Sequence, residues 1–222
     1  MKLLSIETST QMVSCALGDE KKRIFRFSRN KPRAASTLIG DIKRLMDTHR
    51  ATFADIDAFV IGSGPGSFTG LRIGYSLVKG FSIGANKPVI ELGSFLSIVT
   101  QLQSEYTRIA VVSDARRNLF YGASYRIANN KIVRVKKEGL YTPKEFIAHH
   151  SDYVFVTYDE HIRQFLNEQG RNLSVHRGCV WPDAEVLITL AGPLYNKKKY
   201  VKCDTLKPLY LYPKDCQVKR IK

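Results

Sequence analysis

The sequence lacks the residue patterns that mark metal-binding, disulfide-stabilised or exported proteins. Only four of its 222 residues are cysteines, and none forms a CxxC pair or stands at metal-ligand spacing from a histidine. A zinc site or disulfide framework is therefore not expected, and a reducing compartment is favoured. The start, MKLLSIETST, places Glu7 inside what would be a signal peptide's apolar run, and no apolar stretch reaches about 18 residues. We expect a cytoplasmic protein with no membrane span.

Acidic residues are also scarce relative to basic ones. The 35 Lys and Arg residues outnumber the 20 Asp and Glu residues, which gives a formal net charge of +15. Such a charge favours polyanionic partners, nucleic acid first, although a solvated basic surface has the same composition. One cluster contains basic residues and no acid: Lys21, Lys22, Arg23, Arg26, Arg29, Lys31 and Arg33.

Glycine, in contrast, is concentrated in residues 62–74, GSGPGSFTGLRIG. The segment is not a dinucleotide-binding GxGxxG, because Ser67 stands where the third glycine would follow Gly62. It contains no GxxxxGK phosphate loop, and the residues two before and two after Ser67 are Pro65 and Thr69, which excludes a GxSxG nucleophile elbow. What remains is a strand, a Gly-Pro-Gly turn and a helix that begins near Ser67.

Two functions of this glycine loop stay open. Backbone N–H groups at the start of a helix can bind an anion, and the candidate contacts are Gly64, Gly66, Ser67 and Thr69. The favoured alternative is a tight strand-to-helix connection in which Gly64 and Gly66 supply dihedral angles that other residues avoid.

The apolar periodicity predicts an α/β protein. Strands are predicted at 2–7, 12–17, 23–29, 57–62, 87–91, 109–113, 119–127, 131–137 and 153–157. Helices are predicted at 36–49, 69–84, 94–104, 142–150, 162–168 and 184–191.

Four segments occur in an order that resembles the bacterial TsaB (YeaZ) family over nearly the whole chain: SIETST (5–10), PGSFTGLRIG (65–74), SDARRNLFYGASY (113–125) and LKPLYL (206–211). The resemblance implies an actin/Hsp70/sugar-kinase-like (ASKHA) fold with two lobes, each a mixed sheet flanked by helices. We place the lobes at residues 1–103 and 104–222. The resemblance also implies a function: a non-catalytic scaffold and activator for tRNA N6-threonylcarbamoyladenosine (t6A) modification. Such a subunit pairs with a TsaD-type catalytic subunit and a TsaE-type ATPase.

The resemblance implies that this chain has no catalytic residues of its own. TsaD-type proteins carry an HxxxH metal motif, and here Ser94 and Ile98 occupy the two histidine positions. We therefore expect no metal or cofactor bound by this chain alone, with ATP and metal in the partner subunits. Glu7 stands where relatives usually have aspartate, and Asp114 is a second candidate residual acid.

The partner contact is expected on the helices at 36–49 and 69–84. The glycines of the second helix would permit close approach, although core packing inside one chain would also account for its apolar side. The candidate contact residues are Leu38, Ile42, Leu45, Gly70, Leu71, Gly74, Tyr75 and Val78. A homodimer of the isolated chain through the same helices stays open. The basic cluster at 21–33 is the candidate contact with the tRNA backbone. The alternatives are a stand-alone enzyme of the metallopeptidase-like or kinase-like kind, or a basic tRNA-binding module.

Overall fold

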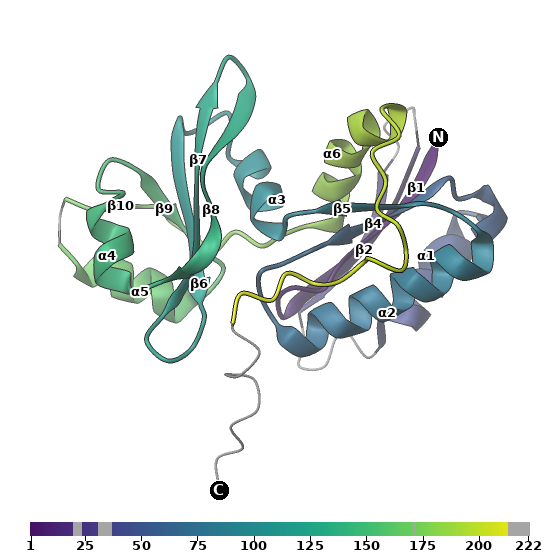
Figure 1. The fold of residues 1–222 in the computed structure, drawn as a ribbon, viewed down its shortest axis with the longest axis horizontal. Coiled ribbons are helices and arrows are strands. Elements are labelled where there is room, and N and C mark those ends of the chain that lie inside the picture. The colour runs from purple at the N-terminus through teal and green to yellow at the C-terminus, as the bar shows by residue number, and fades with distance from the viewer. Residues whose placement is uncertain (20–23, 31–36, 171, 213–222) are drawn as a thin grey trace, which may run out of the picture. The chain divides into compact units, whose positions relative to one another are not determined.

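The computed structural model describes residues 1–19, 24–30, 37–170 and 172–212, and Figure 1 shows its helices and strands. The strands are β1 (Lys2–Glu7), β2 (Met12–Asp19), β3 (Ile24–Asn30), β4 (Ala58–Gly62), β5 (Val89–Leu92), β6 (Arg108–Asp114), β7 (Phe120–Ala128), β8 (Lys131–Tyr141), β9 (Val154–Val156) and β10 (Ser174–Val175). The helices are α1 (Leu38–Thr48), α2 (Phe68–Ala85), α3 (Ser94–Gln101), α4 (Pro143–Ala148), α5 (Glu160–Glu168) and α6 (Ala184–Asn196), with a short 3-10 turn at Phe53–Asp55. The α/β class predicted from the sequence is confirmed.

The chain forms two compact units, and their boundaries differ from the predicted ones. The first unit contains residues 1–98 and 182–208, and the second contains residues 99–181 and the described residues from Leu209 on. The predicted division at 103/104 gave residues 182–208 to the second lobe. The structure returns this segment to the first unit because α6 buries its apolar side against the first sheet.

Each unit is built on a five-stranded mixed sheet, and the two sheets repeat one strand order. The first sheet runs β3-β2-β1-β4-β5. The second, read from its β8 edge, runs β8-β7-β6-β9-β10. In both, three consecutive strands pair antiparallel, a fourth strand pairs parallel with the first of the three, and a fifth pairs parallel with the fourth. This duplicated arrangement confirms the expected actin/Hsp70/sugar-kinase-like fold.

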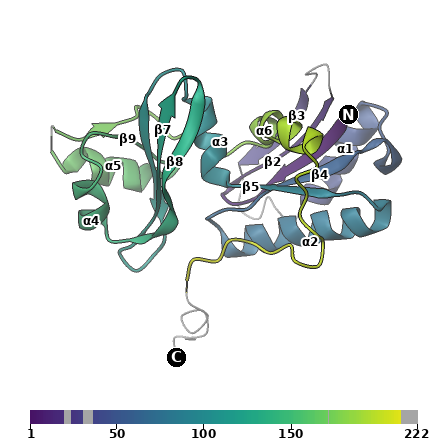
Figure 2. The same ribbon diagram turned by 45° about the horizontal axis from the view of Figure 1, so that its top comes forward.

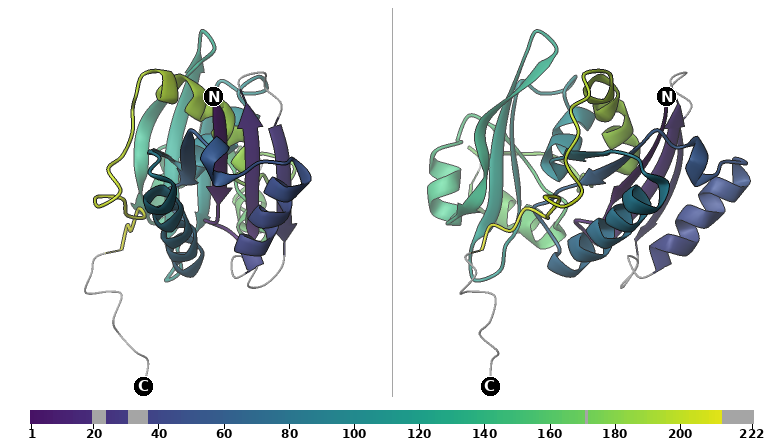
Figure 3. Two further views of the ribbon diagram at one scale, coloured as in Figure 1. Left: turned by 90° about the vertical axis from the view of Figure 1, so that its right-hand side faces the viewer. Right: turned by 45° about the vertical axis from the view of Figure 1, so that its right-hand side comes forward.

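Helices cover both faces of the first sheet. Helices α1 and α2 pack on one face, where Leu4 and Ile6 of β1 point, and α6 packs on the other, where Leu3 points. Figures 2 and 3 show α6 on the side of this sheet opposite α2. The alternation of side chains along β1 thus supplies both halves of the core.

The second unit packs α4 and α5 against one face of its sheet. Phe146 of α4, Leu166 of α5 and Phe155 of β9 are buried in this core. The hairpin of β7 and β8 turns at Asn129 and Asn130, whose φ angles of 51° and 57° match the predicted Asn-Asn turn. No helix in the described part of the chain is long and apolar enough to cross a membrane.

Candidate functional site

The glycine loop connects β4 to α2 at the end of the first sheet, beside the end of β1. Because Ile6 pairs with Ile61 in parallel strands, Glu7 lies next to Gly62. A Cβ atom at Gly62 would overlap the Glu7 carboxylate and lie 2.9 Å from the Ser94 hydroxyl oxygen. A side chain at this position would displace Glu7, so the glycine is required by the buried acid.

Glu7 is fully buried and links three segments of the first unit. Its Oε1 accepts a hydrogen bond from the Ser9 backbone N–H (2.7 Å), and its Oε2 accepts one from the Ser94 hydroxyl (2.7 Å). The Ser94 hydroxyl oxygen in turn accepts from the Gly64 N–H (3.0 Å). Burial raises the pKa of the Glu7 carboxyl, and these hydrogen bonds oppose that shift. The carboxyl therefore joins the β1–β2 turn to the start of α3 and, through Ser94, to the glycine loop.

The glycines of the loop and of early α2 allow the β1–β2 turn to approach closely. An added Cβ would overlap the Ser9 carbonyl oxygen at Gly66, the Thr8 carbonyl oxygen at Gly70 and the Thr8 hydroxyl at Gly74. These glycines therefore serve the close approach that was predicted, but the neighbour is a turn of the same chain.

The N-terminus of α2 is largely occupied by the chain itself. The Ser67 N–H donates to the Ser9 carbonyl (2.6 Å), and the Ser67 hydroxyl caps the helix by accepting from the Gly70 N–H (3.2 Å). Gly64 has a φ of +91°, and Thr69 lies exposed in the first turn of α2. The buried hydroxyl of Thr8 has no hydrogen-bond partner among the described residues. The anion contact at this loop stays a prediction, and the geometry favours a tight connection.

The eight candidate partner-contact residues all lie inside the first unit. Every one is buried: Leu38, Ile42, Leu45, Gly70, Leu71, Gly74, Tyr75 and Val78. The apolar stripe of each helix faces its own sheet, so a partner can reach only the opposite face. That face carries Ile39 (58% exposed) on α1 and Ile83 (72% exposed) on α2. An added Cβ at Gly40, Gly80 or Gly84 meets nothing within 4 Å.

The second candidate acid, Asp114, ends β6 in the second unit. Its Oδ1 accepts from the Arg116 N–H (2.7 Å), and its Oδ2 lies 3.5 Å from the Arg116 guanidinium and 3.6 Å from His161 Nε2. The Asp159 carboxylate accepts a hydrogen bond from the Asp114 N–H (2.8 Å), and burial raises the pKa of the Asp159 carboxyl. These contacts satisfy local donors, and the described residues contain no group of three His, Cys, Asp or Glu placed to hold a metal.

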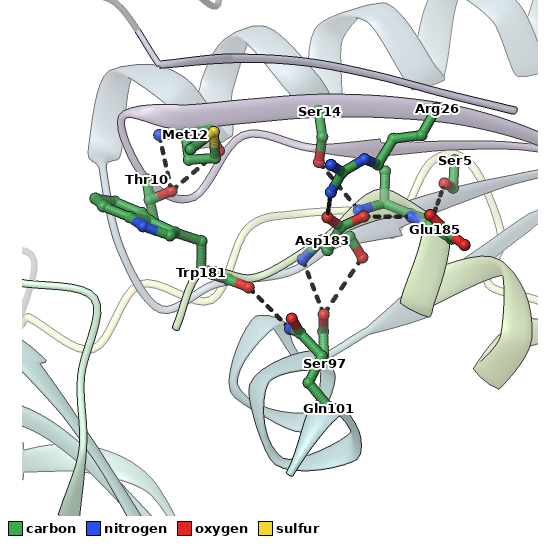
Figure 4. Close-up of polar contacts among 11 residues, drawn as sticks. Ser5, Thr10, Met12, Ser14, Arg26, Ser97, Gln101, Trp181, Asp183 and Glu185 are labelled. Atoms are coloured by element: carbon green, nitrogen blue, oxygen red, sulfur yellow. Dashed lines mark hydrogen bonds and ion pairs between the residues drawn. The ribbon is translucent and has the colours of Figure 1, made fainter. Parts of the chain in front are cut away.

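The basic cluster falls mostly outside the described residues. Lys21, Lys22, Arg23, Lys31 and Arg33 lie outside them, and the side chain of Arg29 is likewise not described. Arg26 forms an ion pair with Asp183 (Figure 4). That pairing leaves Arg26 less available to a phosphate, and the contact of this cluster with tRNA stays a prediction.

Asp183 belongs to a network that sequence reasoning missed, because its members are distant in the chain. Its N–H donates to the Ser97 hydroxyl (2.9 Å), and its carboxylate caps α6 by accepting from the Glu185 N–H (2.8 Å). The next residue, Ala184, donates its N–H to the Ser14 hydroxyl (3.0 Å). Figure 4 shows these bonds converging on the start of α6. They hold this helix on the first sheet.

Comparisons with known proteins agree over most of the chain. Residues 33–170 match the family model for TsaD, tRNA N6-adenosine threonylcarbamoyltransferase. The tRNA threonylcarbamoyladenosine biosynthesis protein TsaB of Escherichia coli K12 is 24% identical over 218 residues, which cover 95% of this chain and 94% of that protein. TsaB of Haemophilus influenzae is 29% identical over 126 residues, 54% of this chain and 52% of that protein.

Solved structures show the same likeness in three dimensions. YeaZ from Pseudomonas aeruginosa superimposes with a TM-score of 0.81 at 24% identity, covering 95% of this chain and 99% of that chain. A second Pseudomonas aeruginosa structure, described as similar to peptidase YeaZ, gives the same TM-score and coverage at 25% identity. Because the family model matches more than half of its residues, the chain belongs to the TsaD family, and its relatives identify it as a TsaB/YeaZ family protein.

Proposed function

We propose that this chain takes part in tRNA threonylcarbamoyladenosine biosynthesis as the TsaB-type subunit of a modifying assembly. The names of its relatives in Escherichia coli and Haemophilus influenzae support this assignment. The formal net charge of +15 suits a protein that works beside RNA. The proposal places this assembly, and the chain with it, in the cytoplasm.

Within the assembly, the chain is a scaffold and activator and not the transferase. The observation that carries this proposal is the state of the two positions that hold metal-binding histidines in TsaD-type proteins. Both are fully buried here, and Ser94 donates its hydroxyl hydrogen to Glu7 while Ile98 packs in the core. A serine engaged in this bond and an isoleucine do not supply the imidazole ligands of that motif. The chemistry, with its ATP and metal, is assigned to the TsaD-type and TsaE-type partners.

The outer faces of α1 and α2 form the joint with the TsaD-type subunit. Exposed isoleucines, Ile39 and Ile83, lie on helices whose outward glycines leave the backbone open to close approach. Burying such side chains against a partner helix contributes about 25 cal/mol for each Å² of apolar surface removed from water. The isolated chain would form a homodimer through the same faces.

The joint is tested at Gly80, where an added side chain meets nothing within the chain. Gly80→Trp is expected to weaken binding to the TsaD-type subunit by tenfold or more, measured by calorimetry, with the thermal unfolding of the variant retained. Asn167→Trp, on the exposed side of α5, is the matched control and should bind as the wild type does. Equal affinities for both variants would place the joint elsewhere.

The proposed function itself is tested by reconstitution. Threonylcarbamoyl transfer to an unmodified tRNA transcript is measured with TsaD-type and TsaE-type proteins, with and without this chain. We expect turnover to depend on the chain and the chain alone to give none. Full turnover without it, or turnover by the chain alone, would contradict the scaffold role.

A further inference from the structure

The β7–β8 hairpin extends beyond the elements that cover the rest of its sheet. Arg108, the first residue of β6, pairs with Arg126, so the hairpin runs on from there to its turn at Asn129 and Asn130 without a third strand in register. Figure 1 shows this end of the hairpin reaching past α4 and α5. We call residues 126–137 the arm. Its sequence, RIANNKIVRVKK, contains basic residues and no acid.

One face of the arm combines unpaired positive charge with an exposed apolar side chain. Partners in register share a face, so Arg126 lies with Val133, and Lys131 lies diagonally beside them through its pairing with Ala128. Val133 is 53% exposed, and both cations are exposed. Neither Arg126 nor Lys131 forms an ion pair with any carboxylate in the described part of the chain. On the opposite face, Arg134 is already paired with Glu138 (2.9 Å).

The base of this face holds a like-charge pair. Arg108 and Arg126 stand directly opposite each other on neighbouring strands, an arrangement that disfavours folding. Asp152 pairs with Arg108 and relieves part of the repulsion, but no second carboxylate among the described residues reaches Arg126. A bound anion would remove the remaining repulsion, because each guanidinium can donate two hydrogen bonds to phosphate oxygens.

We propose that Arg126 and Lys131, on this face of the arm, contact the phosphate backbone of the tRNA that the assembly modifies. The inference rests on the proposed function, which supplies the RNA. Contacts of this kind neutralise phosphates and release counterions, so they strengthen binding without reading sequence. The arm would thus be a second contact with the tRNA backbone, beside the one predicted for the basic cluster at 21–33.

The test compares Arg126→Gln/Lys131→Gln with the control Lys144→Gln/Arg177→Gln, which removes equal charge from exposed positions elsewhere in the second unit. Binding of an unmodified tRNA transcript to the complex with the TsaD-type and TsaE-type subunits is followed by fluorescence anisotropy over a range of salt concentrations. Each lost phosphate contact removes about 0.7–0.9 from the slope of log affinity against log salt. The arm variant should therefore show a slope shallower by about 1.5 and on the order of tenfold weaker binding near 0.1 M salt.

The possible outcomes separate this inference from the proposed function. A slope equal to that of the control overturns the role of the arm, even if transfer activity depends on the chain. The role of the arm is also overturned if the arm variant loses its association with the TsaD-type subunit while tRNA binding is otherwise unchanged. The arm would then be a contact with the protein partner. If the wild-type chain joins no assembly, the proposed function fails, and the same titration on the isolated chain decides the inference.

Discussion

Alanine substitutions at Gly80 and Gly70 should change the free energy of unfolding in opposite directions, although both residues are glycines of α2. At Gly80 an added Cβ meets nothing within 4 Å, so Gly80→Ala gains helix propensity and should stabilise the fold by about 0.5–1 kcal/mol. At Gly70 the new Cβ overlaps the carbonyl oxygen of Thr8. A backbone atom in a sheet turn cannot rotate away, so we expect a loss of about 1–3 kcal/mol from overpacking.

Gly74→Ala should lie between these two variants. Its Cβ overlaps the Thr8 hydroxyl and lies 3.2 Å from Ile61 Cδ1. The Thr8 hydroxyl has no hydrogen-bond partner among the described residues to lose, so its side chain can rotate at a cost below that of moving the backbone.

The series is measured by thermal unfolding, with urea denaturation as a second probe because two compact units need not unfold in one step. For a chain of this size, each kcal/mol corresponds to about 2–4 °C in Tm. We expect Gly80→Ala to raise Tm by about 1–4 °C and Gly70→Ala to lower it by about 2–12 °C. If Gly70→Ala is as stable as Gly80→Ala, the turn does not press on the helix, and our explanation of the glycine loop is wrong.

Two further predictions concern buried polar contacts of the first unit. Burial raises the pKa of Glu7 above its ordinary value of 4.5, so ionisation of this group increasingly opposes folding as pH rises through and above that value. Glu7→Gln should therefore gain stability relative to the wild type as pH rises from about 4.5 towards 7 in urea denaturation, and a pH-independent difference would contradict the raised pKa. Ser97→Ala leaves the Asp183 N–H without its acceptor and should cost about 1–3 kcal/mol, seen as faster hydrogen exchange at the start of α6. Unchanged exchange there would show that the helix does not depend on this bond.

Much of the fold could be predicted from local patterns, and its exceptions have physical causes. Strand β10 contains only Ser174 and Val175, too few residues for any alternation to show. Helix α6 was predicted to end at Ala191, before a Gly-Pro pair that usually stops a helix, yet it continues to Asn196. Leu194 and Tyr195 pack against the core beyond the proline, and this tertiary packing outweighs the local signal.

The candidate site was harder to predict because its contacts join distant segments. Sequence alone treats Gly70, Gly74 and Gly80 alike, since nothing local tells which glycine meets the β1–β2 turn. The apolar stripe of α2 was assigned to a partner, but the same stripe is what a helix needs to cover its own sheet. The pairing of Asp183 with Ser97 likewise depends on how the chain returns to the first unit.

The division of the glycines of α2 between two faces bears on how the protein can act through docking. Gly70 and Gly74 fix the inner side of the helix against a turn that the buried Glu7 carboxyl holds through the Ser9 N–H. Gly80 and Gly84 leave the outer side bare. A helix whose inner face is already fixed in place loses little conformational freedom when a partner packs on its outer face. A smaller entropy loss makes the same contacts bind more tightly. The carboxyl that resembles a residual catalytic acid therefore has a mechanical consequence: it stiffens the surface that we assign to the catalytic partner.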